Sequence, residues 1–330
     1  MEPFLVTLGD PAGIGPEVTA RAWAARQSGN LPSFVAIGDA ASVQAVWDGP
    51  IAMVDSLAAG AAAFANALPV WQVEDSGPLV PGEPTLAGAH CALHSLELGV
   101  GLARAGDAAG LITAPICKDQ LYQVGFTQAG QTEFIADRCG VSRCNAVMML
   151  SGPGLRVVPI TVHVPMRDVP ALLTTELIVA KTLATARGMA KNFGIEYPRL
   201  AIAGFNPHAG ENGALGREEI DIITPAVLKL RAEGVDISGP HSPDALFTPL
   251  ARAGYDAALC MYHDQALIPL KALYFDEGVN LTLGLPIVRT SPDHGTAFGI
   301  AGTGQASAGP MIAAIRMAGK MATVRAQCEA

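Results

Sequence analysis

The chain has 330 residues, which allows one large domain or two domains of medium size. Half of the residues are hydrophobic (50%), 15% are charged, and the net charge is −9 with no run of Lys and Arg. This composition supports a buried core and argues against a nucleic-acid-binding groove or a basic membrane-binding surface. The N-terminus lacks a basic start, and the six cysteines form no Cys-x-x-Cys pair. We therefore expect a cytoplasmic protein with reduced thiols.

Apolar runs that end in Gly, Asp or Pro alternate along the chain with segments of helical period. The expected strands are 4–8, 33–37, 110–113, 157–162, 200–203 and 257–261. The expected helices are 16–26, 87–105, 169–192 and 217–232. This alternation predicts an α/β fold with a largely parallel sheet and helices on both faces.

Three histidines share one setting in the sequence. His163, His208 and His263 each follow an apolar, strand-like run at the point where a loop begins. Because the carboxyl ends of parallel strands share one edge of an open α/β sheet, we expect these side chains to converge there. Three neutral imidazoles and a water form an open site suited to Zn²⁺ or another borderline divalent cation. The alternative is three unrelated loop histidines that bond to the backbone.

Several polar residues are candidates for binding an anion. Gln131 and Thr132 stand at an expected helix start, with Thr132 near the cap, where amides and a hydroxyl bind a phosphate or simply cap the helix. Lys271, Asn280 and Arg289 lie in a stretch otherwise poor in charge, and Arg289 ends an apolar run. A cation at the end of a buried strand is well placed for a carboxylate or phosphate. The alternative is that Arg289 extends its charged end to the protein surface and binds no ligand.

Two loops rich in small residues complete the set of candidates. The loop 9–17 joins the first strand to the first helix and lacks the Gly-x-Gly-x-x-Gly fingerprint of dinucleotide binding, so we expect an architectural role. The loop 291–302 contains a histidine and is either a surface for a nucleotide or a plain connection.

Taken together, these motifs resemble the 4-hydroxythreonine-4-phosphate dehydrogenases, enzymes of pyridoxal phosphate biosynthesis. The similarity extends over nearly the whole chain, from the segment 9–17 to the segment 293–297. The segments Asn-Pro-His-Ala-Gly-Glu at 206–211 and Met-Tyr-His-Asp-Gln at 261–265 are specific to this family. The resemblance implies the α/β fold of the isocitrate and isopropylmalate dehydrogenases, with two lobes around a central cleft.

The resemblance also implies a domain organisation. Residues 1–125 and 281–330 would form the nucleotide-associated lobe, and residues 126–280 the lobe for metal, substrate and dimerisation. Members of the family are homodimers whose sites draw residues from both subunits.

Individual roles follow from the same resemblance. The metal ligands would be His163, His208 and His263. The substrate contacts would be Gln131, Thr132, Lys271, Asn280 and Arg289. The cofactor-binding loop would contain His294, Gly295, Thr296 and Ala297. The candidates for catalysis are Asp244, Asp264 and Lys271, and the sequence leaves open which aspartate transfers a proton and which orients a metal ligand.

The implied reaction is the oxidation of 4-phosphohydroxy-L-threonine by NAD or NADP with a divalent cation, Zn²⁺, Mg²⁺ or Co²⁺. The product, 2-amino-3-oxo-4-(phosphooxy)butanoate, would lose CO₂ to give 3-amino-2-oxopropyl phosphate. One residue departs from the family, which commonly has Gly-His-Thr-Glu where this chain has Gln131. A glutamine forms hydrogen bonds but carries no charge near neutral pH, so it bears directly on substrate identity.

Three alternatives to this reaction stay open. The nearest is a related dehydrogenase of another four-carbon phosphorylated acid, a phosphothreonate or phosphoerythronate. A more distant one is a transferase of acyl phosphates, because phosphate acetyltransferases share the superfamily fold. The third is a non-catalytic protein that binds metal and phosphate.

Overall fold

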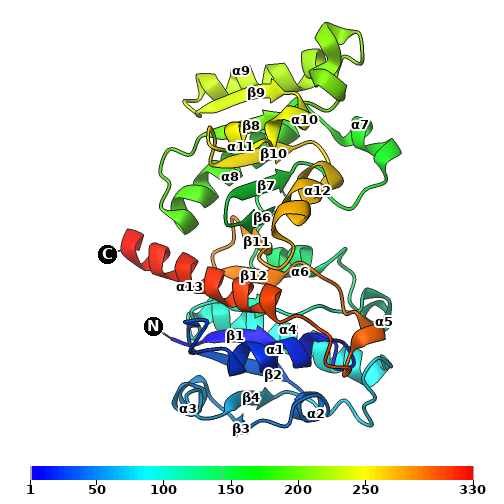
Figure 1. Ribbon diagram of the computed structural model, residues 1–330, viewed down its shortest axis with the longest axis vertical. Coiled ribbons are helices and arrows are strands. Elements are labelled where there is room, and N and C mark those ends of the chain that lie inside the picture. The colour runs from blue at the N-terminus through cyan, green and yellow to red at the C-terminus, as the bar shows by residue number, and fades with distance from the viewer. Residues whose placement is uncertain (1, 143, 330) are drawn as a thin grey trace. The chain divides into compact units, whose positions relative to one another are not determined.

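The computed structural model describes residues 2–142 and 144–329, and the chain divides into two compact units (Figure 1). The first unit comprises Met1–Gly140 and Leu285–Thr323, and the second comprises Val141–Gly284 and Val324–Ala330. Each unit contains its own strands and helices. The functional roles that the sequence assigns to the two lobes are not decided by this division and stay predictions.

The first unit has parallel strands in the order β3-β4-β2-β1-β5-β12. The strands are β1 (Phe4–Thr7), β2 (Phe34–Gly38), β3 (Ile51–Val54), β4 (Leu68–Gln72), β5 (Leu111–Thr113) and β12 (Arg289–Pro292). The helices are α1 (Gly15–Ala24), α2 (Ala40–Gln44), α3 (Leu57–Ala63), α4 (Leu86–Ala105), α5 (Lys118–Gln123), α6 (Gln131–Arg138), η4 (Phe298–Ile300) and α13 (Gly309–Glu329). The central strands β1, β2 and β5 are buried along their whole length, as expected for a parallel sheet covered by helices.

The second unit has strands in the order β11-β6-β7-β10-β8-β9. The strands are β6 (Val147–Gly152), β7 (Leu155–Pro159), β8 (Leu200–Ala203), β9 (Ile237–His241), β10 (Ala257–Cys260) and β11 (Val279–Leu283). The helices are η1 (Met166–Asp168), α7 (Val169–Leu172), α8 (Thr175–Phe193), η2 (Pro207–Gly213), η3 (Glu219–Ile223), α9 (Thr224–Ala232), α10 (Pro243–Leu246), α11 (Pro249–Arg252) and α12 (His263–Tyr274). β6 pairs with β7 and β11 in antiparallel fashion, whereas β7, β10, β8 and β9 are parallel.

The α/β class with a largely parallel sheet is confirmed, and all six expected strands are present. Two expected helices were wrong in detail. The helix expected over 169–192 is interrupted between α7 and α8, because Thr174 is extended and its hydroxyl accepts a hydrogen bond from the amide of Leu177 at 3.1 Å. The helix expected over 217–232 starts with the π-helical turn η3 before α9 begins. The strands β3, β4, β6, β9 and β12 were missed, since runs this short carry little periodic signal.

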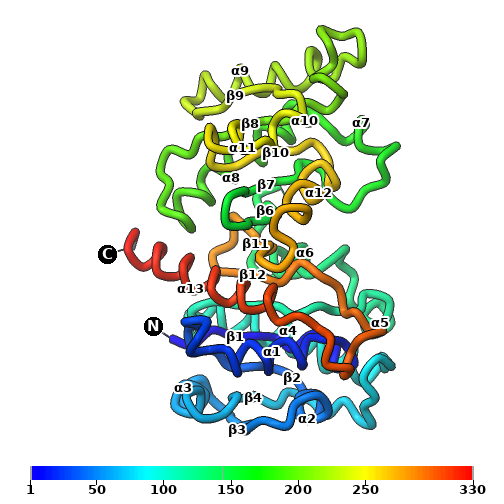
Figure 2. The backbone as a smooth tube through the Cα atoms, viewed as in Figure 1, coloured from blue at the N-terminus to red at the C-terminus, as the bar shows by residue number. Residues whose placement is uncertain are grey.

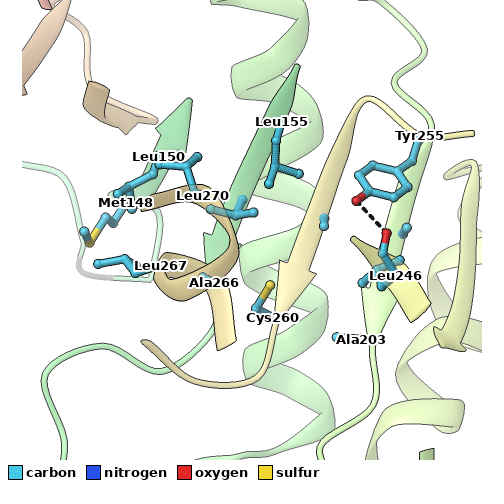
Figure 3. Packing of buried hydrophobic residues seen from close by; sticks show 13 residues of the cluster. Met148, Leu150, Leu155, Ala203, Leu246, Tyr255, Cys260, Ala266, Leu267 and Leu270 are labelled. Carbon is cyan, nitrogen blue, oxygen red and sulfur yellow. Dashed lines mark hydrogen bonds between the residues drawn. The ribbon is translucent and has the colours of Figure 1, made fainter. Parts of the chain in front are cut away.

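The core of the second unit anchors helix α12 to the strands beside it. Ala266, Leu267 and Leu270 on one side of α12 pack with residues of β6, β7 and β10 (Figure 3). Leu270 is completely buried, so its replacement by alanine would cost about 2–5 kcal/mol of stability. This packing places the first residue of α12, His263, immediately beyond the carboxyl end of β10.

All six cysteines are free. Among the described residues no single helix has the length and apolar character needed to cross a membrane. One bent pair, Met166–Leu172 with Thr175–Phe193, meets the length and composition requirement only when its two helices are taken together.

Candidate active site

The carboxyl ends of three neighbouring parallel strands carry the three histidines. β7, β10 and β8 lie side by side in the second unit and run in the same direction. His163 follows β7 on the path towards α7 that Figure 2 traces, His208 lies in η2 after β8, and His263 begins α12 after β10. Since the strands are parallel, all three residues leave the sheet at the same edge.

His163 and His263 lie next to each other. Their ring centroids are 5.5 Å apart, and both line a cavity of about 160 Å³ together with Thr161, Val164, Met166, Val169, Tyr262 and Asp264. Nδ1 of His263 is 2.7 Å from Oδ1 of Asp264. A carboxylate accepts a hydrogen bond from a nitrogen that carries a proton. This bond therefore assigns the proton of His263 to Nδ1 and leaves the lone pair of Nε2 for a ligand.

His208 does not join this pair in a complete metal site. Over residues 2–142 and 144–329 no three His, Cys, Asp or Glu side chains are close enough together to hold a metal ion. The donors nevertheless suit a borderline divalent cation, because two imidazoles share one cavity and one of them already has its Nδ1 held by a carboxylate. The expected convergence of the three side chains is thus present for two of them.

His208 contributes to lowering the pKa of Asp244. A hydrogen bond from Ser242 Oγ to Asp244 Oδ1 at 2.5 Å, supported by backbone amides and by the electrostatic attraction of His208, lowers the pKa of Asp244 below its ordinary value. Asp244 is therefore ionised at neutral pH.

Lys271 and Asn280 also belong to the second unit. Lys271 lies on α12, the helix that begins with His263, and is half-buried. Asn280 lies on β11, where its Oδ1 is shielded from solvent and has no hydrogen-bond partner among the described residues. A shielded amide oxygen without a partner is unfavourable unless a ligand or water donates to it.

A buried arginine lies among hydroxyl groups in the first unit. Arg289 is only 3% exposed, and its guanidinium donates to the hydroxyls of Thr113 at 2.8 Å and Thr132 at 3.3 Å. Burial lowers the pKa of Arg289 to about 10, although Glu133 acts in the opposite direction. The guanidinium therefore stays charged at neutral pH, and a charged guanidinium in a poorly hydrated position is suited to binding an anion.

One expectation for this group needs correction. Arg289 opens β12 rather than ending a strand, because Gly284 takes up the left-handed region (φ +83°) after β11 and breaks the apolar run. The expected helix start is present: the N-cap is Gly130, and Thr132 is the second residue of α6.

Gln131 is held at the first position of α6. Its Nε2 donates to the carbonyl of Ala114 at 3.0 Å, and its Oε1 is shielded from solvent without a partner among the described residues. Lys118 lies nearby, since a Cβ on Gly130 would be 3.9 Å from its Nζ. Thr113 and Lys118 were absent from the expected substrate contacts. Thr113 is the last residue of β5, and Lys118 is the first residue of the next helix, α5.

The loop around Thr296 is tied to the loop 9–17. The amide of Ile14 donates to the carbonyl of Thr296 at 3.0 Å, and a Cβ on Gly13 would lie 3.1 Å from the same oxygen. Ala297 adopts positive φ (+46°), and Nδ1 of His294 is 3.0 Å from the carbonyl of Gly295. The glycine loop 9–17 therefore shapes the predicted cofactor loop, beyond joining β1 to α1.

Comparison with known proteins identifies the family. The family model of the pyridoxal phosphate biosynthetic protein PdxA matches residues 30–318. This chain belongs to the PdxA family. A relative from Zymomonas mobilis named 4-hydroxythreonine-4-phosphate dehydrogenase is 54% identical over 322 residues, which cover 98% of this chain and 96% of the relative. A relative of the same name from Erythrobacter litoralis is 55% identical over 329 residues, covering 98% of each chain.

A solved structure has the same fold. The 4-hydroxythreonine-4-phosphate dehydrogenase from Klebsiella pneumoniae superposes with a TM-score of 0.86 at 36% identity, over 97% of this chain and 98% of that chain. The resemblance seen in the sequence is thereby confirmed for the family and the fold. The roles of the individual site residues stay predictions.

Proposed function

We propose that this PdxA-family protein oxidises 4-phosphohydroxy-L-threonine with NAD or NADP, in a reaction that requires a divalent cation. The product is 2-amino-3-oxo-4-(phosphooxy)butanoate, which decarboxylates to 3-amino-2-oxopropyl phosphate in pyridoxine phosphate biosynthesis. The observation that carries the proposal is the identity of 54% and 55%, over nearly the whole chain, with two relatives that bear this enzyme's name. The arrangement of histidines and anion-binding residues described above supports it.

The cation would be held by His163, His208 and His263. When bound, a Zn²⁺, Mg²⁺ or Co²⁺ ion would supply a Lewis acid for the substrate's hydroxyl and carbonyl oxygen. The neighbouring rings of His163 and His263 would provide two of the ligands. His208 would be the third, because it follows β8, which runs parallel to β10 and so ends at the same sheet edge.

The two aspartates take different roles in this proposal. Asp264 orients a ligand, because its carboxylate accepts the Nδ1 proton of His263 and so fixes the ring and its tautomer. Asp244 is a weak base, because the bond from Ser242 and the attraction of His208 lower its pKa. Lys271 is the third residue that the sequence assigned to catalysis, and it would neutralise a negative group of the substrate.

The substrate contacts that the resemblance implies offer suitable groups for the negative charges of the substrate. Arg289 and Thr132 offer charged and neutral donors in the first unit, with Gln131 beside them. Asn280 and Lys271 offer an amide and an ammonium group in the second unit. Neutralising the carboxylate and the phosphate in a site that excludes water would also favour the loss of CO₂ from the oxidised product.

Residues His294, Gly295, Thr296 and Ala297 would contact the nicotinamide nucleotide. Support comes from the backbone bond between Ile14 and Thr296, which holds this loop in one conformation. We further propose that the protein works as a homodimer in the cytoplasm, as the family resemblance implies.

The decisive experiment measures NAD⁺ and NADP⁺ reduction by the purified protein with 4-phosphohydroxy-L-threonine. The assay is run as purified, after chelation, and after adding back Zn²⁺, Mg²⁺ or Co²⁺. Activity that disappears on chelation and returns with metal supports the reaction class, the cofactor and the metal together. Turnover with a phosphothreonate or phosphoerythronate instead would show the related dehydrogenase, and the absence of any nicotinamide reduction would overturn the proposal.

A further inference from the structure

The turn that carries His208 has a rare backbone conformation. Gly213 has a φ of 97°, and the five residues before it, His208 to Asn212, also have positive φ, with values of 52°, 52°, 78°, 46° and 55°. Their ψ values of 29°, 41°, 0°, 51° and 31° place the segment in the left-handed helical region. Only Gly210 adopts this region without steric penalty, so the other four residues need support from their surroundings.

A buried carboxylate lies against this turn. Glu219 is 4% exposed, and its Oε1 accepts hydrogen bonds from the amides of Phe205 and Asn206, both at 2.7 Å. Its Oε2 accepts from Nδ2 of Asn206 at 2.9 Å. Bonds from amides to a carboxylate are roughly twice as strong as those between neutral groups, so Glu219 holds the residues that lead into the turn.

The inner side of the turn is built around the same carboxylate. A Cβ on Gly210 would lie 2.5 Å from Oε2 of Glu219, and a Cβ on Gly204 would lie 3.0 Å from Oε1. The carboxylate thus touches the backbone both before and within the left-handed segment. Glu219 also begins the π-helical turn η3, a form that occurs frequently at functional sites.

We propose that Glu219 is a positioning residue whose carboxylate holds the 204–212 turn in its left-handed form and thereby sets the position of His208 at the sheet edge of His163 and His263. The inference rests on the proposed function, because it assigns His208 to the metal site. Glu219 itself touches neither substrate nor metal in this scheme, and it acts only through the backbone that carries the ligand.

The test is zinc binding to the full-length, metal-free protein, measured by isothermal titration calorimetry. Glu219→Gln is expected to weaken Zn²⁺ affinity by about 10- to 100-fold, the usual effect of losing a group that orients a metal ligand. Glu219→Ala is expected to weaken it further, since the amide oxygen of Gln still accepts one of the bonds. At saturating zinc, kcat of Glu219→Gln should return to near the wild-type value, because only the position of the ligand has changed.

Glu218→Gln is the matched control. Glu218 precedes Glu219 and accepts a bond from Asn206 Nδ2 at 2.7 Å, whereas the amides of Phe205 and Asn206 donate to Glu219. Both variants replace a carboxylate with an amide, so a general electrostatic effect would change the two affinities equally. Equal loss in the two variants would overturn the inference.

The remaining outcomes separate the inference from the proposed function. Wild-type protein that binds no zinc would overturn the metal site, and the inference with it. If the wild-type protein and a folded Glu219→Gln variant bind zinc with equal affinity, the inference is overturned and the proposed metal site is not. If circular dichroism shows that Glu219→Gln does not fold, Asn206→Ala decides, because it removes the side chain that bridges Glu218 and Glu219. Reduced zinc affinity in that variant supports the inference, and unchanged affinity overturns it.

Discussion

Arg289 shows how much a single buried side chain contributes to the proposed site. Its guanidinium is almost fully buried and donates to the hydroxyls of Thr113 and Thr132. A guanidinium in such a poorly hydrated position is well suited to binding a carboxylate or phosphate. The arginine therefore links the local packing of the first unit to the recognition of a phosphate or carboxylate.

The first prediction concerns this arginine. Arg289→Lys keeps the charge but loses the planar fork of donors, so kcat/KM for the phosphorylated substrate should fall by about 10- to 100-fold, the value of one charged hydrogen bond. Steady-state kinetics measure the effect. Arg138→Lys on the surface of α6 is the control, since it alters a half-exposed ion pair with Glu97 and a contact with the ring of Phe134. An Arg289→Lys enzyme as efficient as wild type would exclude Arg289 from the substrate site.

A second prediction tests the orienting role of Asp264. Asp264→Asn weakens the bond to Nδ1 of His263, so zinc affinity should fall by about 10- to 100-fold while the fold is retained. Calorimetry with Zn²⁺ measures this loss. Asp221→Asn, which alters an exposed pair with Arg217, should leave zinc affinity unchanged. Equal affinities in the two variants would contradict the assignment.

Gln131 provides a third prediction, with a pH dependence. In Gln131→His, the new imidazole would become cationic as the pH falls below about 6.5 and would then attract the anionic substrate. KM of the variant should therefore decrease as the pH is lowered from about 8 to about 6, beyond any change seen in the wild-type enzyme. Parallel pH profiles of KM for the two proteins would show that residue 131 does not face a charged group of the substrate.

At the scale of elements, helix α1 supports the predicted cofactor loop through one ion pair. Glu17 is 2% exposed, and its Oε2 accepts from the amide of Gly302 at 3.1 Å, while its Oε1 pairs with Arg21 at 3.0 Å. Arg21 in turn donates to the carbonyls of Ala306 at 2.9 Å and Gly304 at 2.8 Å. The pair thus joins one face of α1 to the backbone that follows η4.

A fourth prediction follows for this element. Arg21→Ala removes two hydrogen bonds to the backbone just after the loop 291–302 and the ion pair with Glu17, whose carboxylate bonds to the amide of Gly302. The loop should therefore become more mobile, and KM for NAD(P)⁺ should rise by about 3- to 30-fold, with a smaller change in substrate KM. Kinetics with each substrate varied in turn separate the two constants. Arg26→Ala, just beyond the same helix, serves as the control because Arg26 donates to the carbonyls of Trp23 and Ala65. A change in substrate KM alone would contradict this role.

For the molecule as a whole, exposed apolar side chains in the second unit support the proposed dimer. Ile268 is 65% exposed and Phe275 is 71% exposed, and Leu273 between them is also exposed. Ile268 and Leu273 lie on α12 and Phe275 directly follows it, and exposed apolar side chains of this size are unfavourable in water unless another surface covers them.

The fifth prediction tests this association. Light scattering at micromolar concentration should give twice the chain mass of 34.0 kDa, and Phe275→Glu should shift the protein towards the monomer and lower its activity. Leu250→Glu is the control, because Leu250 is 89% exposed on α11 and stands apart from the α12 residues in the sequence. A fully active monomer would contradict both the dimer and a site shared between subunits.

The sequence by itself determined the class of fold, the family and the setting of the three histidines. Apolar runs and helical periodicity reflect local preferences of the residues, so they predict the strands and helices. Long motifs such as 206–211 identify the family. His163, His208 and His263 each follow a strand, and that could be deduced because strand ends are visible in the sequence.

Only the tertiary structure decided which of these residues meet. It placed β10 between β7 and β8, brought His163 and His263 together, and buried Arg289 beside Thr113, which the sequence had not included. It also brought the carboxylate of Glu219 to the amides of Phe205 and Asn206, which lead into the left-handed turn of His208. Such contacts join residues distant in the chain, and their order depends on strand pairing and packing, which no local pattern of residues specifies.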